Sequence, residues 1–213
     1  MAQEKMKIGE ISKPRFEFRS FGTDFAREAS RMAELSAPVP EHVKVRHSDE
    51  IYIMSRTNDV NNTKIRGGKM DIKTYVQTTD GLEQWNPLMK AEFPVSCTVL
   101  EGEVFPAFQV DMPAFEKEEY TRDEFLALVK AHPDLQAVTV NKERFGHMVN
   151  DTICEVANVE IDGNTVVTIN SESTEIPDVL KTLSDVGLEG VENINYLQAI
   201  KRTIGWIDKP LAN

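Results

Sequence analysis

Short stretches of alternating polar and apolar residues dominate the chain. The first is Arg15-Phe16-Glu17-Phe18-Arg19, where charged and aromatic residues fall on opposite sides of an extended segment. Similar β-rich segments follow at residues 51–56, 63–66 and 70–73, and turn residues such as Asn-Asp, Asn-Asn and Gly-Gly separate them. The pattern predicts a meander of antiparallel strands in which one face of each strand is polar.

A β-hairpin is predicted in the last third of the chain. Residues 152–161 and 164–171 flank the pair Asp162-Gly163, which suits the positive φ angles of a type I′ turn. Polar and apolar residues alternate again along the second of these strands, so it too should have one polar face.

Four segments have the spacing and end signals of amphipathic helices. They are residues 24–35, the segment from the capping box Thr121–Glu124 to Pro133, the segment from Pro177 to Gly187, and a segment after Asn195 that ends near Gly205. Leu82, Trp85 and Met89 also lie at helical spacing, and we expect ordinary packing there in preference to a ligand lid. Runs of strands with helices between them indicate an α+β fold with an antiparallel sheet, not a parallel Rossmann-like one.

Composition and charge narrow the class of protein. The chain has 213 residues, with 24 Lys or Arg against 35 Asp or Glu, and its formal net charge is −11. Such a surface repels nucleic acid and anionic membranes, so an anionic ligand requires a local basic site. Neither a bilayer-spanning apolar run nor a secretory signal within residues 1–14 is present, so we expect a cytoplasmic protein. Cys97 and Cys154 are expected to be reduced, packed thiols.

Basic residues share a face on several predicted strands. Arg15 and Arg19 lie on either side of Glu17, Lys64 pairs with Arg66, and Lys142 pairs with Arg144. Residues two apart on a strand project to the same side, and two positive groups on one side suit phosphate. The alternative is that these are solvent-facing positions of a half-buried sheet, where acidic neighbours such as Glu17 and Asp71 offset the cations.

Other chemical signals in the sequence are weak. The four histidines, His42, His47, His132 and His147, include no pair at the helical spacing of a metal site, and no Gly-x-Ser-x-Gly motif is present. Gly67-Gly68-Lys69 lacks the glycine spacing of a phosphate loop and is interpreted as a tight connection between strands.

The order of these segments, from about Arg15 to about Trp206, resembles the CYTH superfamily of triphosphate tunnel metalloenzymes, which includes thiamine triphosphatases, tripolyphosphatases and class IV adenylyl cyclases. In that family a Glu-x-Glu-x-Lys strand precedes strands with basic pairs, a late acidic strand, and a helix with a basic residue. The corresponding segments here are Arg15–Arg19, Lys64–Arg66, Asp71–Lys73, Lys142–Arg144, Cys154–Glu160, Ile169–Glu172, and Asn193–Tyr196 with Lys201.

The resemblance implies an antiparallel, eight-stranded, barrel-like tunnel with peripheral helices. It also implies that basic side chains grip a triphosphate or polyphosphate, while carboxylates hold Mg²⁺ or Mn²⁺. The implied phosphate-binding residues are Arg15, Arg19, Arg56, Lys64, Arg66, Lys73, Lys142, Arg144 and Lys201, and the implied metal ligands are Glu17, Glu155 and Glu172.

The chain departs from the family pattern at three positions. Arg15 replaces the first acid of the opening motif, Arg19 replaces its lysine, and Asn170 replaces one acid of the late Glu-x-Glu pair. Two hypotheses therefore stand. The first is a metal-dependent triphosphate or polyphosphate hydrolase, and the second is a non-catalytic protein that binds an anionic ligand or a partner on the same scaffold.

The expected organisation is a single CYTH-like domain at residues 15–207, with tails at 1–14 and 208–213. The expected ligand is a small or polymeric phosphate compound, and neither nucleic acid nor membrane is expected as a partner. The sequence leaves open a homodimer, the substrate's organic part, and the choice between hydrolase and cyclase chemistry.

Overall fold

Eight strands form a closed antiparallel barrel in the order β1-β10-β9-β8-β2-β3-β4-β5. The computed structural model describes residues 14–213. The barrel strands are β1 (Phe16–Gly22), β2 (Val45–Ser55), β3 (Asn61–Arg66), β4 (Lys69–Thr79), β5 (Leu82–Glu92), β8 (Leu135–Val149), β9 (Thr152–Ile161) and β10 (Asn164–Ser173). The predicted α+β class and eight-stranded barrel are confirmed, and β2, β3 and β4 form the predicted meander.

Two tight turns lie where the sequence predicts them. Between β9 and β10, Asp162 and Gly163 have φ angles of 48° and 82°, as a type I′ turn requires. Between β3 and β4, Gly67 and Gly68 have φ angles of 55° and 76°, and a side chain at either position would strain the backbone. Gly67 and Gly68 therefore form the turn that connects β3 to β4.

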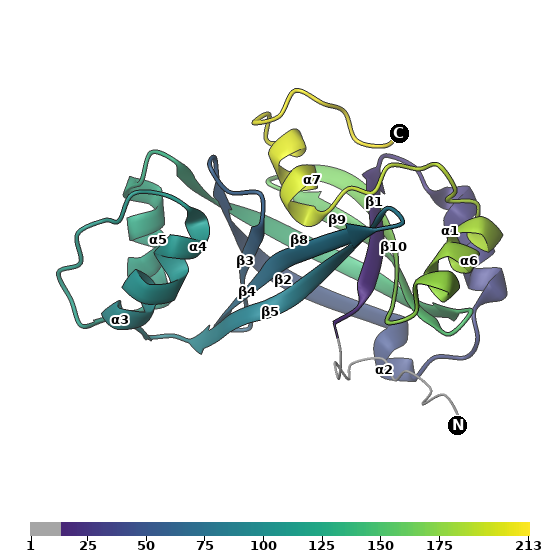
Figure 1. The fold of residues 1–213 in the computed structure, drawn as a ribbon, viewed down its shortest axis with the longest axis horizontal. Coiled ribbons are helices and arrows are strands. Elements are labelled where there is room, and N and C mark those ends of the chain that lie inside the picture. The colour runs from purple at the N-terminus through teal and green to yellow at the C-terminus, as the bar shows by residue number, and fades with distance from the viewer. Residues whose placement is uncertain (1–13) are drawn as a thin grey trace.

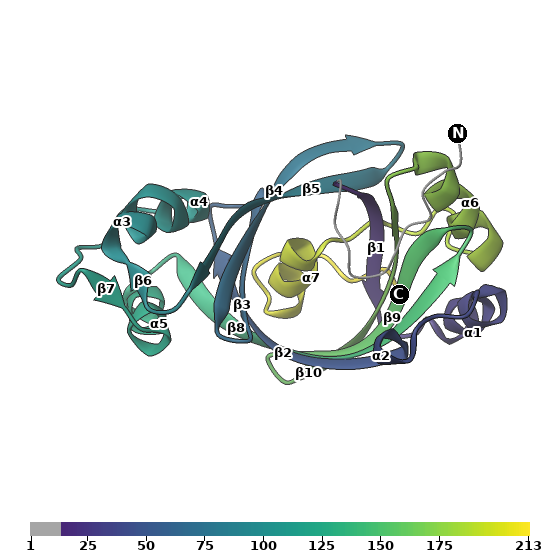
Figure 2. The same cartoon turned by 90° about the horizontal axis from the view of Figure 1, so that it is seen from below.

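Helices cover one side and one end of the barrel. Figure 1 places α1 (Ala26–Leu35) and α6 (Ile176–Val186) together on one side, and the short α2 (Glu41–Lys44) leads into β2. The last helix, α7 (Tyr196–Thr203), lies over one open end of the barrel, and Figure 2 shows it through the ring of strands. Gly187 ends α6 with a φ of 94°, as predicted, and α7 follows Asn195, whose side chain caps it.

A separate group of short elements projects from the barrel between β5 and β8. It contains β6 (Val95–Ser96), α3 (Cys97–Val99), a π-helical turn η1 (Leu100–Val104), α4 (Phe105–Phe108), β7 (Glu119–Tyr120) and α5 (Arg122–Ala131). The capping box at Thr121 and the helix after it are confirmed. Fully buried Phe105, Phe108 and Phe125 pack together in this region, in a hydrophobic cluster that also includes Ile53 and Ile72 of the barrel strands.

The helical spacing of Leu82, Trp85 and Met89 is misleading, because these residues lie in strand β5. Trp85 pairs with Tyr75 of β4, and their rings meet edge to face with centroids 5.6 Å apart. The pairing of β4 with β5 shifts register twice, and such irregularities move buried positions away from strict alternation. Pro87 lies beside one of these shifts, where a strand tolerates proline.

The inward face of the barrel changes character along each strand. On β8, Val138 and Val140 belong to an apolar cluster that includes Leu197 of α7. Further along the same face, Lys142 and Arg144 line a cavity. Because side chains two apart point the same way, the barrel interior is apolar where it meets α7 and polar toward the opposite end.

The end of the chain lies against β1. The backbone N–H of Ala212 donates to the carbonyl of Phe21, and the Asn213 side chain accepts hydrogen bonds from the backbone N–H groups of Thr23 and Asp24. Most of the N-terminal tail predicted at 1–14 lies outside the described residues. Within residues 14–213, none of the helices is both long and apolar enough to cross a membrane.

Candidate functional site

The polar part of the barrel interior encloses a tunnel with two connected chambers. The inner chamber, of about 130 Å³, lies beneath α7 and is lined by Glu50, Tyr52, Trp85, Lys142 and Tyr196, among others. The outer chamber, of about 630 Å³, lies toward the opposite end of the barrel. Six residues line both chambers: Glu17, Arg19, Lys64, Lys73, Arg144 and Glu155.

Positive charge predominates in the outer chamber, although the whole chain is acidic. Its eight basic residues are Arg15, Arg19, Arg46, Lys64, Arg66, Lys73, Lys90 and Arg144. Its four acidic residues are Glu17, Asp71, Glu155 and Glu172. The chamber thus has a surplus of four positive charges, whereas the chain as a whole carries −11. The local field favours an anion despite the acidic exterior.

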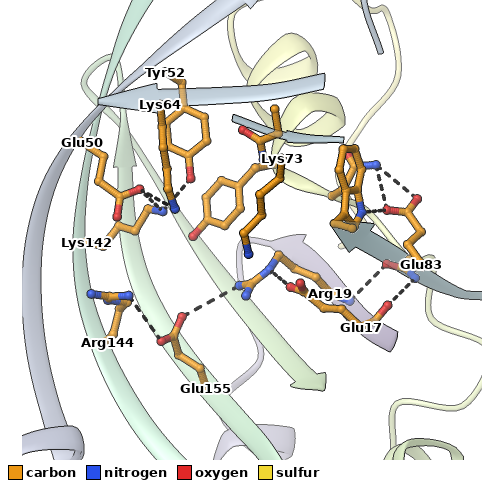
Figure 3. Close-up of a pocket in the computed structure, with 15 residues that line it drawn as sticks. Glu17, Arg19, Glu50, Tyr52, Lys64, Lys73, Glu83, Lys142, Arg144 and Glu155 are labelled. Atoms are coloured by element: carbon orange, nitrogen blue, oxygen red, sulfur yellow. Dashed lines mark hydrogen bonds and ion pairs between the residues drawn. The ribbon is translucent and has the colours of Figure 1, made fainter. Parts of the chain in front are cut away.

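Glu155 lies among three arginines in the outer chamber. Its carboxylate accepts a hydrogen bond from Arg46 Nη2 at 2.9 Å, and lies 3.9 Å from Arg144 Nη1 and 4.0 Å from Arg19 Nη1. Figure 3 shows Arg19 and Arg144 on either side of it. The buried Nε atoms of Arg46 and Arg144 have no hydrogen-bond acceptor among residues 14–213. A buried donor without an acceptor is costly, so these two donors leave a hydrogen-bonding requirement that the described residues do not meet.

A second group of charges joins the first strand to the last strand of the barrel. Glu17 of β1 and Glu172 of β10 are directly paired residues. Arg19 Nε donates to Glu17 at 2.5 Å, and Arg15 Nη1 donates to Glu172 at 3.3 Å. Burial opposes ionisation of Glu17, but the charges of Arg19 and Lys73 outweigh it and lower its pKa.

Glu172 responds to the same environment in the opposite direction. Burial and then the negative charge of Glu17 raise the pKa of Glu172, and this effect exceeds the opposing influence of Arg15. The two facing carboxylates therefore differ in their readiness to ionise. The difference arises because nearby cations outweigh burial at Glu17, whereas burial and the negative charge of Glu17 outweigh the cations at Glu172.

The inner chamber contains a buried lysine and glutamate pair. Lys142 Nζ donates to Glu50 Oε2 at 2.8 Å and to the Tyr52 hydroxyl at 2.9 Å, and lies 3.8 Å from the centre of the Tyr196 ring. Burial opposes the charge of Glu50, but Lys64, Lys142 and other cations lower its pKa to about 2. Burial lowers the pKa of Lys142 to about 7, although Glu50 favours its charged form.

Polar side chains hold the segment before α7 over the inner chamber. Asn195 Nδ2 donates to both carboxylate oxygens of Glu83, and Trp85 Nε1 donates to the same carboxylate. The Asn193 amide accepts from the backbone N–H of Arg19 and donates to the carbonyl of Gly81. These bonds tie the α7 segment to β1 and β5, so the inner end of the tunnel has a defined shape.

The structure brings ten of the twelve predicted site residues to the tunnel. They are Arg15, Arg19, Lys64, Arg66, Lys73, Lys142, Arg144, Glu17, Glu155 and Glu172. The other two lie elsewhere. Lys201 Nζ donates to the Asn58 carbonyl at 2.9 Å and to Asp59 at 2.8 Å. The Arg56 guanidinium lies over the Trp206 ring, 4.2 Å from its centre.

Sequence reasoning missed several tunnel residues on β2. Arg46, Glu50 and Tyr52 all line the tunnel. Arg46 and Glu50 were missed because β2 begins at Val45, six residues before the segment predicted from Ile51, whereas Tyr52 lies within that segment but was not singled out. The signal was present, since positions 46, 48, 50 and 52 alternate with their neighbours. Few of these residues are apolar, so the pattern resembled a polar loop.

The carboxylates in the tunnel do not fit the metal site that the resemblance implies. Among the residues that the structure describes, no three His, Cys, Asp or Glu side chains gather as a metal site would require. Glu17, Glu155 and Glu172 each have an arginine as hydrogen-bond donor, and Asn170, at the position of a family acid, is uncharged. A divalent cation here would meet guanidinium groups that already occupy the carboxylate oxygens.

The comparisons with known proteins concern the fold. No protein-family model and no curated protein matches the chain. Among solved structures, it is similar to a conserved hypothetical protein from Pyrococcus furiosus, at 15% identity and a TM-score of 0.48, over 86% of this chain and 98% of that one.

Two further solved structures are named as cyclases. One is a proposed adenylate cyclase from Bacillus halodurans, at 12% identity and a TM-score of 0.48, over 87% of this chain and 97% of that one. The other is a proposed adenylyl cyclase from Hippeastrum with a dominant triphosphatase activity, at 12% identity and a TM-score of 0.45, over 90% and 96%. The structure itself has the closed eight-stranded antiparallel barrel that the resemblance to CYTH-like proteins implies.

Proposed function

We propose that this protein binds a condensed phosphate anion, such as a triphosphate, in the outer chamber of its tunnel, and that a divalent metal is not needed for this binding. The observation that carries the proposal is the pair of buried Nε donors on Arg46 and Arg144, which have no acceptor within the described residues and line the same chamber. Guanidinium groups bind phosphate oxygens through short charge-assisted hydrogen bonds, often two at a time.

Electrostatics supports the same conclusion. Burying like charges together is costly unless counter-charges accompany them. The internal carboxylates offset only part of the positive charge of the outer chamber and leave a surplus of four. An anion with several charged oxygens would complete this balance, whereas a neutral ligand would not.

The test is calorimetric titration of tripolyphosphate into the chelator-treated protein and into an Arg144→Gln variant. We expect saturable binding to the unaltered protein. Because a hydrogen bond to a charged group contributes about 1.5–3 kcal/mol, we expect Arg144→Gln to weaken binding by about 10- to 100-fold.

Arg122→Gln is the matched control. Arg122 lies exposed on α5, where it pairs with Asp123, so its loss removes one positive charge outside the tunnel. Equal affinity in the Arg144→Gln and unaltered proteins would refute the site. Release of inorganic phosphate in a parallel Mg²⁺ titration, absent with chelator, would support instead the metal-dependent hydrolysis that the resemblance implies.

A further inference from the structure

Each carboxylate that the family resemblance assigns to a metal is held by an arginine. Arg46 donates to Glu155 at 2.9 Å, and Arg15 donates to Glu172 at 3.3 Å. Their side chains are 31% and 10% exposed, so both pairs are at least partly withdrawn from water.

The three carboxylates come from strands that neighbour one another in the barrel. In the register of β1, β10 and β9, Glu17 pairs with Glu172, and Asn170 pairs with both Arg19 and Glu155. This is where a cation shared by these acids would have to lie. The buried Oδ1 atom of Asn170 has no donor among residues 14–213, so the amide adds an oxygen but no charge.

Positive charge already occupies this position. The Arg19 guanidinium contacts Glu17 at 2.5 Å and reaches to within 4.0 Å of Glu155, so it lies between two of the three acids. Arg46 adds a second cation at Glu155, and Arg15 adds one at Glu172. A divalent ion would be repelled by all three guanidinium groups and would have to displace their hydrogen bonds.

We propose that the guanidinium groups of Arg15 and Arg46 take the place of a divalent cation in this tunnel, so that a condensed phosphate is held by basic side chains without a metal. This inference rests on the proposed function and adds which residues supply the charge. The charge balance also limits the class of ligand. A terminal phosphate group carries about −1.5 to −2 charges near neutral pH, so balancing a surplus of four requires at least two phosphate groups.

The two arginines also give Glu155 and Glu172 a role other than metal binding. Without Glu155 and Glu172, the arginines of the outer chamber would repel one another in a partly buried space. The carboxylates therefore act as internal counter-ions that keep the guanidinium groups in position while the tunnel is empty. If the two arginines are replaced, these carboxylates should bind a divalent metal.

The test uses an Arg15→Gln/Arg46→Gln double variant, with Arg15→Lys/Arg46→Lys as the matched control that keeps the charge. Binding of Mn²⁺ alone is followed by electron paramagnetic resonance, and tripolyphosphate binding is followed by calorimetry. We expect the glutamine variant to gain an Mn²⁺ site that Glu172→Gln abolishes, and to bind tripolyphosphate at least about 10-fold more weakly in chelator. The unaltered protein and the lysine variant should gain no such Mn²⁺ site.

Two results would overturn the inference while leaving anion binding intact. One is an Mn²⁺ site in the unaltered protein that Glu172→Gln abolishes. The other is a folded glutamine variant that binds tripolyphosphate in chelator as tightly as the unaltered protein. If the double variant does not fold by circular dichroism, Arg15→Gln alone is judged by the same two readouts. Failure of the unaltered protein to bind tripolyphosphate in any buffer would instead refute the proposed function itself.

Discussion

At the scale of single residues, the environment of Lys142 is unusual because its ammonium group is almost fully enclosed. Its side chain is 4% exposed, and Glu50 and Tyr52 of β2 accept its hydrogen bonds. Tyr196 of α7 lies over it, and the cations Lys64 and Arg19 add repulsion from β3 and β1. Burial dominates this balance and lowers the pKa of Lys142 to about 7.

This arrangement leads to a pH-dependence prediction. Between pH 7 and the ordinary lysine value of 10.5, the unfolded chain binds the Lys142 proton and the folded chain does not. The stability cost of Lys142 is therefore greatest below pH 7 and decreases as pH rises through this window. We expect carbon-13 lysine NMR to show one lysine titrating near pH 7, absent in Lys142→Met, and to show its pKa rise when tripolyphosphate binds. Titration of every lysine above pH 9 would contradict this account.

At the scale of secondary-structure elements, α7 closes the inner end of the tunnel, and Lys201 anchors it. The Lys201 ammonium group is 4% exposed and joins α7 to the loop between β2 and β3 through Asp59 and the Asn58 carbonyl. Tyr196 packs on Tyr52, with ring centroids 5.3 Å apart. In this position the Lys201 ammonium group forms its hydrogen bonds with the protein and not with a ligand.

The anchoring role predicts a stability effect without an affinity effect. Lys201→Ala should lower the free energy of unfolding by roughly 1.5–3 kcal/mol, since it removes charge-assisted hydrogen bonds and leaves the Asn58 carbonyl unpaired. The matched control is Lys209→Ala, which removes an exposed lysine after α7 and should change stability by less than about 1 kcal/mol. Denaturant unfolding and calorimetry are the measurements. A 10-fold loss of tripolyphosphate affinity in Lys201→Ala would show that Lys201 reaches the phosphate.

The elements that could be predicted from sequence are those whose signals are local. The Asp162-Gly163 turn, the Thr121 capping box and Gly187 each fix a backbone conformation within a few residues. Strand β5 was not predicted, because its register shifts against β4 break the expected alternation. The short helices after β6 were missed because their stability comes from aromatic packing between distant residues such as Phe105 and Phe125.

The same distinction applies to the tunnel. Shared faces of single strands predicted most of the basic residues, because side-chain direction follows from strand geometry. Which acid pairs with which arginine depends on contacts such as Arg46 with Glu155, across 109 positions of sequence. Those contacts depend on barrel closure, which periodicity does not determine. The absence of an acidic metal cluster among the described residues could therefore be established only from the structure.

At the scale of the whole molecule, charge is divided between exterior and interior. The chain has a formal net charge of −11, yet the outer chamber has a surplus of four positive charges inside a closed barrel. The acidic exterior disfavours long polyanions such as nucleic acid on the surface. The basic chamber inside the barrel has a volume of about 630 Å³. On the proposed function, we therefore expect the protein to bind condensed phosphates inside the barrel in preference to nucleic acid on its surface.

The most direct test of the central claim is a crystal structure of the protein grown with tripolyphosphate and Mn²⁺. We expect phosphate oxygens within hydrogen-bond distance of the Nε atoms of Arg46 and Arg144, and no anomalous manganese peak among Glu17, Glu155 and Glu172. Phosphate found only outside the barrel, or manganese bridging those carboxylates, would contradict the account.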